Sequence, residues 1–425
     1  MLTYFLFIFY LVAGIIALHL IIRRKGIGLS IRHTAAAVLF RVFLGCLYGY
    51  IFLHYYGGDD TWGYFLESRG ETDVLLTHPL RFIREFLPSF SFQAAQYQVW
   101  PAVVLYVVHF ENWFMVKFLA VLNLLSGKNY YIDLLWFDLL TITGPLMFYK
   151  MLVRRFPSRA GMYYLLVFFI PSVTFWLSGI RAEALIFLFM VVAIYNGKRF
   201  AQSPGIKQAA GLFLGLTGFL FFRMQFLVIF LPALIAYMLS VKNNQSAPVY
   251  FNRIYLLMLL LISGSLFLPP AYQLSRPLIS AQQSFSVLHG NTRYALDSLQ
   301  PGPVSPIKVF PQALANSTFR PYPWEGKGLL QSLSSIENIF LFGGFLFFIL
   351  SFPKKHKVTD PLLWLFLYYG LTQLLGIGYT VPFPGAIVRY RCIPFLFLLI
   401  FFFSANDLLQ QKITRILFKK DYKLF

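Results

Sequence analysis

Long apolar runs separated by short basic clusters constrain the fold of this chain more than any motif does. Runs of about 17 to 25 apolar residues can cross a bilayer as helices, and this criterion gives roughly eleven predicted spans. They cover residues 3–22, 36–56, 132–152, 162–177, 184–195, 210–222, 227–239, 254–268, 339–352, 362–379 and 393–403. A chain that is 58% hydrophobic and 12% charged has too little polar surface for a soluble globule. We therefore predict an all-α, polytopic integral membrane protein.

The basic clusters predict how the chain is oriented. They lie in the connections 23–33, 150–159, 198–207, 242–253 and 354–357 and in the tail from residue 412. Cytoplasmic loops of membrane proteins are enriched in Lys and Arg, so these segments are expected in the cytoplasm and the amino terminus outside. The first run is followed by basic residues rather than a small-residue cleavage site, which predicts a retained helix. The net charge of +20 is thus a topology signal and does not indicate nucleic-acid binding.

These spans divide the chain into five predicted segments. Residues 1–56 form two helices, 57–131 an outer loop, 132–268 a transmembrane core, 269–338 an outer loop or small cap, and 339–425 the last helices and a basic tail. In the first outer loop, the amphipathic stretch 79–87 and the apolar stretches 99–110 and 113–125 are interpreted as interfacial or re-entrant helices. The alternative, a full span at 113–125, would place Lys150 and Arg154 outside, against the charge bias.

Two adjacent acids, Asp59 and Asp60, follow Gly57 and Gly58 at the outer end of the second predicted span. An Asp in this position can simply cap the next helix. Two neighbouring carboxylates also repel each other's charge, which makes one of them a candidate proton acceptor. We predict Asp60 as the catalytic base, Asp59 as the second choice, and Glu183 as a further carboxylate in a short outer loop.

Arginines at the predicted outer helix ends suit an anionic ligand. A guanidinium offers a fork of donors that matches phosphate oxygens, and positive charge on this side runs against the topology trend. An interfacial ion pair or a side chain that extends toward lipid headgroups is the structural alternative. The predicted phosphate-binding residues are Arg181, Arg223, Arg389 and Arg391.

A second group of residues suits a sugar. Arg320, Trp324 and Glu325 join a cation, an aromatic ring and an acid in a proline-rich segment, which could stack on a sugar face and bind its hydroxyls. A rigid turn with an interfacial Trp is the competing interpretation. His54 and Trp62, which flank the acidic motif, complete the predicted sugar- or acceptor-binding set. The sequence has no nucleotide-binding P-loop, HExxH pair or GxSxG elbow, which argues against ATP-driven transport by this chain alone.

The order of these features resembles that of the GT-C glycosyltransferase superfamily. The resemblance rests on the carboxylate motif in the first outer loop, the amphipathic stretches after it, and the segment from Pro171 to Glu183, and covers mainly residues 56–195. The chain is also similar to membrane proteins of bacterial surface-polysaccharide clusters, in which segments like 320–325 and 389–391 recur. It departs from the superfamily because an extra span precedes the motif, the motif is Asp-Asp rather than Asp-Glu, and the soluble carboxy-terminal domain of many members is missing.

The resemblance implies an inverting transfer of a sugar from a polyprenyl-phosphate donor to a lipid-linked or surface glycan acceptor. The reaction would take place at the outer face of a bacterial cytoplasmic membrane. The outer-loop acid of the superfamily corresponds to Asp59 or Asp60, and its second-loop acid to Glu183. A divalent cation, Mg²⁺ or Mn²⁺, held by these three carboxylates is compatible with this interpretation. The alternatives are a repeat-unit polymerase and a lipid-linked glycan transporter, for which Asp138 is the main candidate for a charge inside the membrane.

Overall fold

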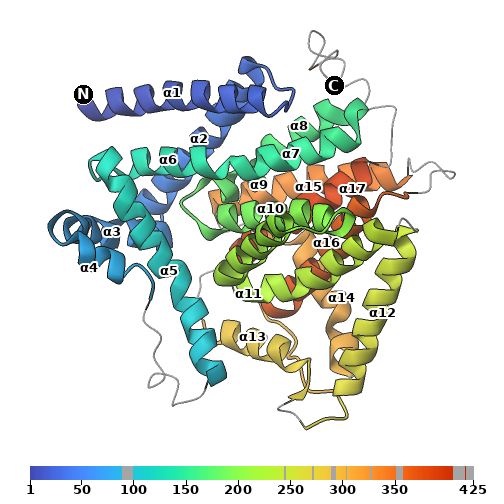
Figure 1. Cartoon of the computed structure of the whole chain (residues 1–425). Coiled ribbons are helices and arrows are strands. Elements are labelled where there is room, and N and C mark those ends of the chain that lie inside the picture. The colour runs from blue at the N-terminus through green and yellow to red at the C-terminus, as the bar shows by residue number, and fades with distance from the viewer. Residues whose placement is uncertain are drawn as a thin grey trace. The chain divides into compact units, whose positions relative to one another are not determined.

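The computed structural model describes residues 1–88, 99–243, 246–269, 272–288, 293–302, 304–325, 328–350, 358–404 and 417. Within these residues the regular elements are helices and no strand occurs, so the predicted all-α class is confirmed (Figure 1). The chain forms two compact units. Unit 1 holds Met1–Asn196 and Ile206–Leu227, and unit 2 holds Gly197–Gly205 and Val228–Lys412.

Unit 1 contains the amino-terminal helices. They are α1 (Leu2–Arg24), α2 (Ile31–His54), α3 (Asp60–Thr77), α4 (Pro79–Arg84), α5 (Val99–Ser126), α6 (Tyr130–Thr141), α7 (Thr143–Arg155), the 3₁₀ turn η1 (Pro157–Arg159), α8 (Ala160–Phe168) and α9 (Pro171–Ser178). Most of α10 (Ala182–Gln202) and the first part of α11 (Ile206–Asn243) also belong to this unit.

Unit 2 contains the rest of α11 and the helices that follow it. They are α12 (Ala247–Ser265), α13 (Arg276–Ser286), α14 (Val304–Phe319), the 3₁₀ turn η3 (Pro323–Glu325), α15 (Leu329–Leu350), α16 (Pro361–Thr380) and α17 (Pro384–Phe403). Helix α16 is the centre of this unit because α12, α13, α14 and α17 all contact it.

Nine helical stretches in the described residues are long and apolar enough to cross a membrane. They are Leu2–Arg24, Ile31–His54, Leu105–Ser126, Tyr130–Arg155, Ala182–Gln202, Ile206–Asn243, Ala247–Ser265, Pro361–Thr380 and Pro384–Phe403. A tenth arises if Pro157–Phe168 and Pro171–Ser178, which are bent by 57°, are one broken span. The chain is therefore a multi-pass membrane protein, as predicted.

The predicted spans correspond to the helices with some differences in their bounds. Residues 210–222 and 227–239, predicted as separate spans, lie in two helical segments of α11 that meet at a kink, where Arg223 has φ and ψ angles of −158° and 79°. Residues 99–125, predicted as separate interfacial pieces, form the single helix α5. The predicted span 339–352 falls on the end of α15, and its residues 351 and 352 lie outside the described part of the chain.

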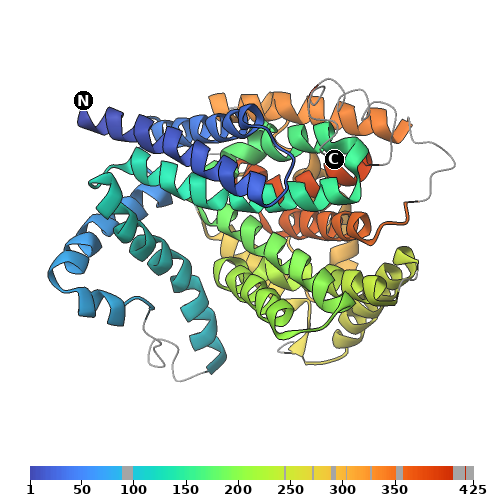
Figure 2. The same ribbon diagram turned by 45° about the horizontal axis from the view of Figure 1, so that its top comes forward.

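Helices α3 and α5 are neighbours in unit 1 (Figures 1 and 2). Polar side chains of α5 contact α3. Lys117 has no exposed side-chain surface and donates to Glu71 of α3 at 2.5 Å. The amide of Asn123 donates to the hydroxyls of Ser68 and Thr72, both at 2.9 Å. The two helices are thus joined by buried polar contacts as well as by apolar packing.

A buried ion pair holds three other helices of unit 1 together. Arg41 of α2 donates from Nε to Asp138 of α6 at 2.8 Å, and its Nη2 donates to Thr141 Oγ1 at 2.8 Å. The same Nη2 donates to the carbonyl of Leu177 near the end of α9. Asp138 therefore has a structural partner, and the chain that leaves α9 is fixed to α2 and α6.

Candidate functional site

The acidic motif lies at a sharp turn between α2 and α3. Gly57 and Gly58 have φ angles of 77° and 113°, in the left-handed region that favours glycine. Asp59 then adopts an extended conformation and caps α3, which begins at Asp60. The two carboxylates consequently start from adjacent residues but point into different surroundings.

The Asp59 carboxylate is saturated with hydrogen bonds. Its Oδ1 accepts from the backbone N–H and the hydroxyl of Thr61 at 3.2 and 2.7 Å. Its Oδ2 accepts from the hydroxyl of Tyr48 and, at 2.8 Å, from Nη1 of Arg181. The side chain is 12% exposed. Four donors on one carboxylate indicate that Asp59 organises the site.

The Asp60 carboxylate is open. Its side chain is 67% exposed, and its Oδ2 lies 3.4 Å from Nη2 of Arg181. A single long contact leaves most of its acceptor capacity for another group. Asp60 is therefore the carboxylate of this motif that a ligand could reach.

Arg181 begins a row of alternating charges that runs through unit 1. Its Nε lies 3.4 Å from Glu183 Oε2, Glu183 Oε1 lies 3.8 Å from Nη2 of Arg223, and Nη1 of Arg223 donates to Glu111. We call Asp59, Asp60, Arg181, Glu183, Arg223 and Glu111 together the charged row. It brings two of the four predicted arginines and all three predicted catalytic acids into one cluster.

Arg181, Glu183 and Arg223 of the charged row lie at helix ends or at a break in a helix. Arg181 lies in the turn between α9 and α10, where a Cβ added to Gly179 would lie 3.2 Å from the ring of Tyr48. Glu183 is in the first turn of α10, and Arg223 occupies the break in α11. Non-helical backbone at a helix break lets a charged side chain turn toward neighbouring groups within an otherwise apolar segment.

The electrostatics of the charged row hold Arg181 in its charged form. Burial opposes the charge, but Tyr48 and the carboxylates of Glu183, Asp59 and Asp60 together raise the pKa of its guanidinium well above the usual value. Burial, assisted by nearby acids, also raises the pKa of Tyr64 above its ordinary range. With four carboxylates and two guanidiniums, the row carries an excess of two formal negative charges.

The predicted divalent cation does not fit these residues well. Within the described residues no group of three or more His, Cys, Asp or Glu side chains could hold a metal ion. Asp59, Asp60 and Glu183 all face the guanidinium of Arg181, whose fixed charge occupies the space between them. We therefore derive no chemical step through a metal.

The other two predicted phosphate-binding arginines belong to unit 2. Arg391 is buried and its Nη1 donates to the carbonyls of Ser317, Thr318 and Arg320, at 3.2, 3.2 and 2.6 Å. Its Nη2 donates to the side chain of Asn338. These bonds satisfy the carbonyls at the end of α14, so Arg391 has a structural role in unit 2. Arg389 donates to the hydroxyl of Tyr390 at 2.6 Å.

The predicted sugar-binding segment forms a rigid turn in unit 2. Arg320 pairs with Glu325 at 3.1 Å and stacks on the ring of Tyr294 at 3.7 Å from its centroid. Glu325 also accepts from the backbone N–H of Tyr322 at 3.1 Å. The ring of Trp324 is stacked on that of Tyr322 and is 80% exposed. The turn thus presents one aromatic face to its surroundings.

His54 and Trp62 lie near the acidic motif but have different roles. Trp62 stacks on Tyr130 with ring centroids 3.8 Å apart, and its Nε1 donates to the carbonyl of Gly49 at 3.0 Å. It therefore packs α3 onto α2 and α6. His54 is exposed at the end of α2, with its ring 4.5 Å from that of Tyr50.

Two residues of this site were not predicted from the sequence. Tyr48 donates to Asp59 and accepts from Arg181, and Glu111 pairs with Arg223. Glu111 carries a signal that could have been used, because it is an isolated acid between two apolar stretches. Tyr48 lies between Gly45 and Gly49 on one helix, a spacing that indicates close packing of another segment.

Comparison of the chain with known protein families, with curated proteins and with solved structures found no match.

Proposed function

We propose that the chain is a membrane glycosyltransferase that moves a sugar from a polyprenyl-phosphate donor to a glycan acceptor at the outer face of the membrane. The observation that supports this proposal is that the two adjacent acids differ in hydrogen bonding and in exposure. Asp59 is held by four donors, whereas Asp60 is open and lies beside a charged arginine. An exposed carboxylate on a fixed backbone is what a general base for a hydroxyl group requires.

In the proposed reaction, the Asp60 carboxylate accepts the proton of the acceptor hydroxyl. The hydroxyl oxygen forms a new bond to the anomeric carbon of the donor sugar, and the bond between that carbon and the phosphate oxygen breaks. The phosphate leaves with the bonding electron pair, and the configuration at the anomeric carbon inverts. Asp59 and Tyr48 contribute by holding Arg181, and through it the position of Asp60.

Negative charge that develops on the leaving phosphate needs a cation nearby. Arg223 is the better candidate in unit 1, because its side chain is 21% exposed while that of Arg181 is 6% exposed. Glu183 and Glu111 hold Arg223 from two sides and so fix its direction. We assign Arg181 the role of positioning Asp60 and Arg223 the contact with phosphate.

The test compares Asp60→Asn with Asp59→Asn in cells that lack the native chain. Removing a general base is expected to lower transfer by about 10²–10⁴-fold, so Asp60→Asn should abolish complementation while its membrane level stays normal. Asp59→Asn should instead lower the level or thermal stability of the protein. The measurement is the composition of the surface and lipid-linked glycans, together with the amount of protein in the membrane.

The outcomes separate the candidate functions. Repeat units that lack one particular sugar, both without the protein and with Asp60→Asn, support the transferase and name its product. Complete single units that fail to polymerise would indicate a polymerase. Normal glycans in cells without the protein would contradict both and favour transport. Full complementation by Asp60→Asn would show that Asp60 is not the base.

A further inference from the structure

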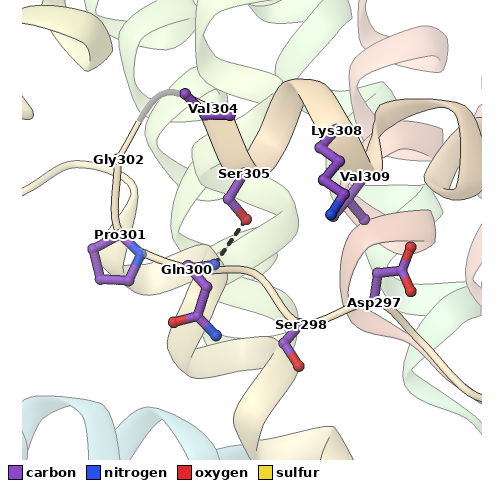
Figure 3. Close-up of a pocket in the computed structure, with 9 residues that line it drawn as sticks. All are labelled: Asp297, Ser298, Gln300, Pro301, Gly302, Val304, Ser305, Lys308 and Val309. Atoms are coloured by element: carbon purple, nitrogen blue, oxygen red, sulfur yellow. Dashed lines mark hydrogen bonds between the residues drawn. The ribbon is translucent and has the colours of Figure 1, made fainter.

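A pocket of about 560 Å³ lies entirely within unit 2, between the extended segment 297–302 and the first turns of α14. Figure 3 shows Asp297, Ser298 and Gln300 on the extended segment, and Ser305 and Lys308 on the helix. The volume falls within the range of pockets that hold small ligands. None of these residues belongs to the charged row of unit 1.

The backbone of the extended segment is fixed by buried side chains. The amide of Gln282, from α13, donates to the carbonyls of Asp297 and Tyr379 at 3.0 and 2.8 Å, and its Oε1 accepts from Leu299 N–H at 2.7 Å. Further along, the N–H of Gln300 donates to the hydroxyl oxygen of Ser305 at 2.8 Å (Figure 3).

The helix side of the pocket is fixed as well. The hydroxyl of Tyr379 donates to the carbonyl of Pro306 at 2.8 Å, which ties the first turn of α14 to α16. Gln312 of α14 accepts from the N–H of Asp297 at 2.9 Å. The backbone of both walls is therefore already ordered without a ligand, so its ordering adds no entropy cost to binding.

The side chains that line the pocket keep their hydrogen-bonding capacity. Within the described part of the chain, no hydrogen bond is formed by the side chains of Asp297, Ser298, Gln300 or Lys308. These four exposed residues offer an ammonium, a carboxylate, an amide and a hydroxyl along one pocket. One positive and one negative group on the same pocket suit a neutral ligand with many hydroxyl groups better than a phosphate or a cation.

We infer that this pocket binds one sugar residue of the glycan acceptor, an inference that rests on the proposed transferase function. Lys308 and Gln300 donate to the sugar hydroxyls and Asp297 accepts from them. The pocket is a second proposed carbohydrate contact in unit 2, in addition to the predicted one at Arg320, Trp324 and Glu325. It selects the acceptor and takes no part in the chemical step.

The test measures binding of oligosaccharides released by mild acid from the surface polysaccharide of the cells that make the protein. The full chain is placed in lipid nanodiscs and binding is followed by saturation-transfer NMR. Lys308→Met and Gln300→Leu should each weaken binding about tenfold, the loss expected when one hydrogen bond to a ligand is removed. Lys242→Met, an exposed lysine at the end of α11, is the matched control and should bind as the wild type does.

The binding results decide whether the pocket is a sugar site. Wild-type affinity in both pocket variants, or no binding by the wild-type chain, would overturn the inference. Weak binding by both variants, with normal binding by Lys242→Met, would support it. The transferase proposal fails separately: if cells without the protein have normal glycans but the pocket variants still lose sugar binding, the pocket is a glycan site of a protein with another activity.

Discussion

Glu183 joins the two arginines of the charged row, and its position determines what a substitution there should do. Its side chain is buried and lies within 3.4 Å of Arg181 and 3.8 Å of Arg223. Without the charge of Glu183, Arg181 keeps Asp59 and Asp60 and Arg223 keeps Glu111, so the cost is that of lost charged contacts, about 1–3 kcal/mol. Glu183 therefore contributes to the stability of the site and holds the two guanidiniums at a fixed separation.

We predict that Glu183→Gln lowers the free energy of unfolding of the purified protein by about 1–3 kcal/mol. Asp60→Asn is the matched control, because substitutions at exposed positions usually change stability by about 0.5 kcal/mol or less. Thermal unfolding in detergent, followed by circular dichroism, measures both. Equal unfolding temperatures for the two variants would contradict a structural role for Glu183.

The residues of the charged row also show what a single sequence can and cannot predict. The capping role of Asp59 follows from local pattern, because a Gly-Gly turn before an Asp marks a helix start. The contact between Arg181 and Asp59 joins residues 122 positions apart and depends on how α2, α3 and α9 pack. Distances of this kind cannot be read from spacing along the chain, so the acids and Arg181 could be proposed as candidates but not as a cluster.

Helices α14 and α16 approach each other closely at Gly378. A Cβ added there would lie 2.6 Å from the carbonyl carbon of Ala313 and nearer still to its oxygen. Backbone atoms cannot move aside as the end of a side chain can. We expect Gly378→Ala to force the helices apart at a cost of about 1–3 kcal/mol, as overpacking of cores usually does.

Gly376→Ala provides the control on the same helix. Its Cβ would meet only the terminal Cδ1 of Ile229, at 3.0 Å, which a change of side-chain rotamer can relieve. Thermal unfolding should therefore show a clear loss for Gly378→Ala and a small one for Gly376→Ala. Similar losses for the two variants would show that contact between α14 and α16 does not limit stability.

The helices themselves were largely predictable, because an apolar run long enough to cross a bilayer has few alternatives to a helix. The predicted break between 210–222 and 227–239 corresponds to the kink of α11, where Arg223 has non-helical backbone angles. A charged residue inside an apolar run therefore marked the interruption. The sequence did not show that the two segments follow each other without a loop.

The position of α5 determines on which side of the membrane every later segment lies. Its segment Leu105–Ser126 is long and apolar enough to do so. However, its Lys117 is paired with Glu71, and Lys128 just beyond it with Asp73 at 2.6 Å, both on the polar helix α3. Each charge at the centre of a bilayer costs about 2.5–3.5 kcal/mol. We propose that α3, α4 and α5 lie together on the outer side.

Single cysteines test this proposal. In a chain whose native Cys46 and Cys392 are replaced, we place a cysteine at Gly70, Lys128 or Arg154 and label intact cells with a membrane-impermeant maleimide. If α5 stays outside, Gly70→Cys and Lys128→Cys react at once, whereas Arg154→Cys reacts only after permeabilisation. If α5 crosses, every later segment is reversed: Lys128→Cys becomes protected and Arg154→Cys reacts from outside. This result would also place the end of α7 on the side of the acidic motif, against the direction that the basic clusters predict.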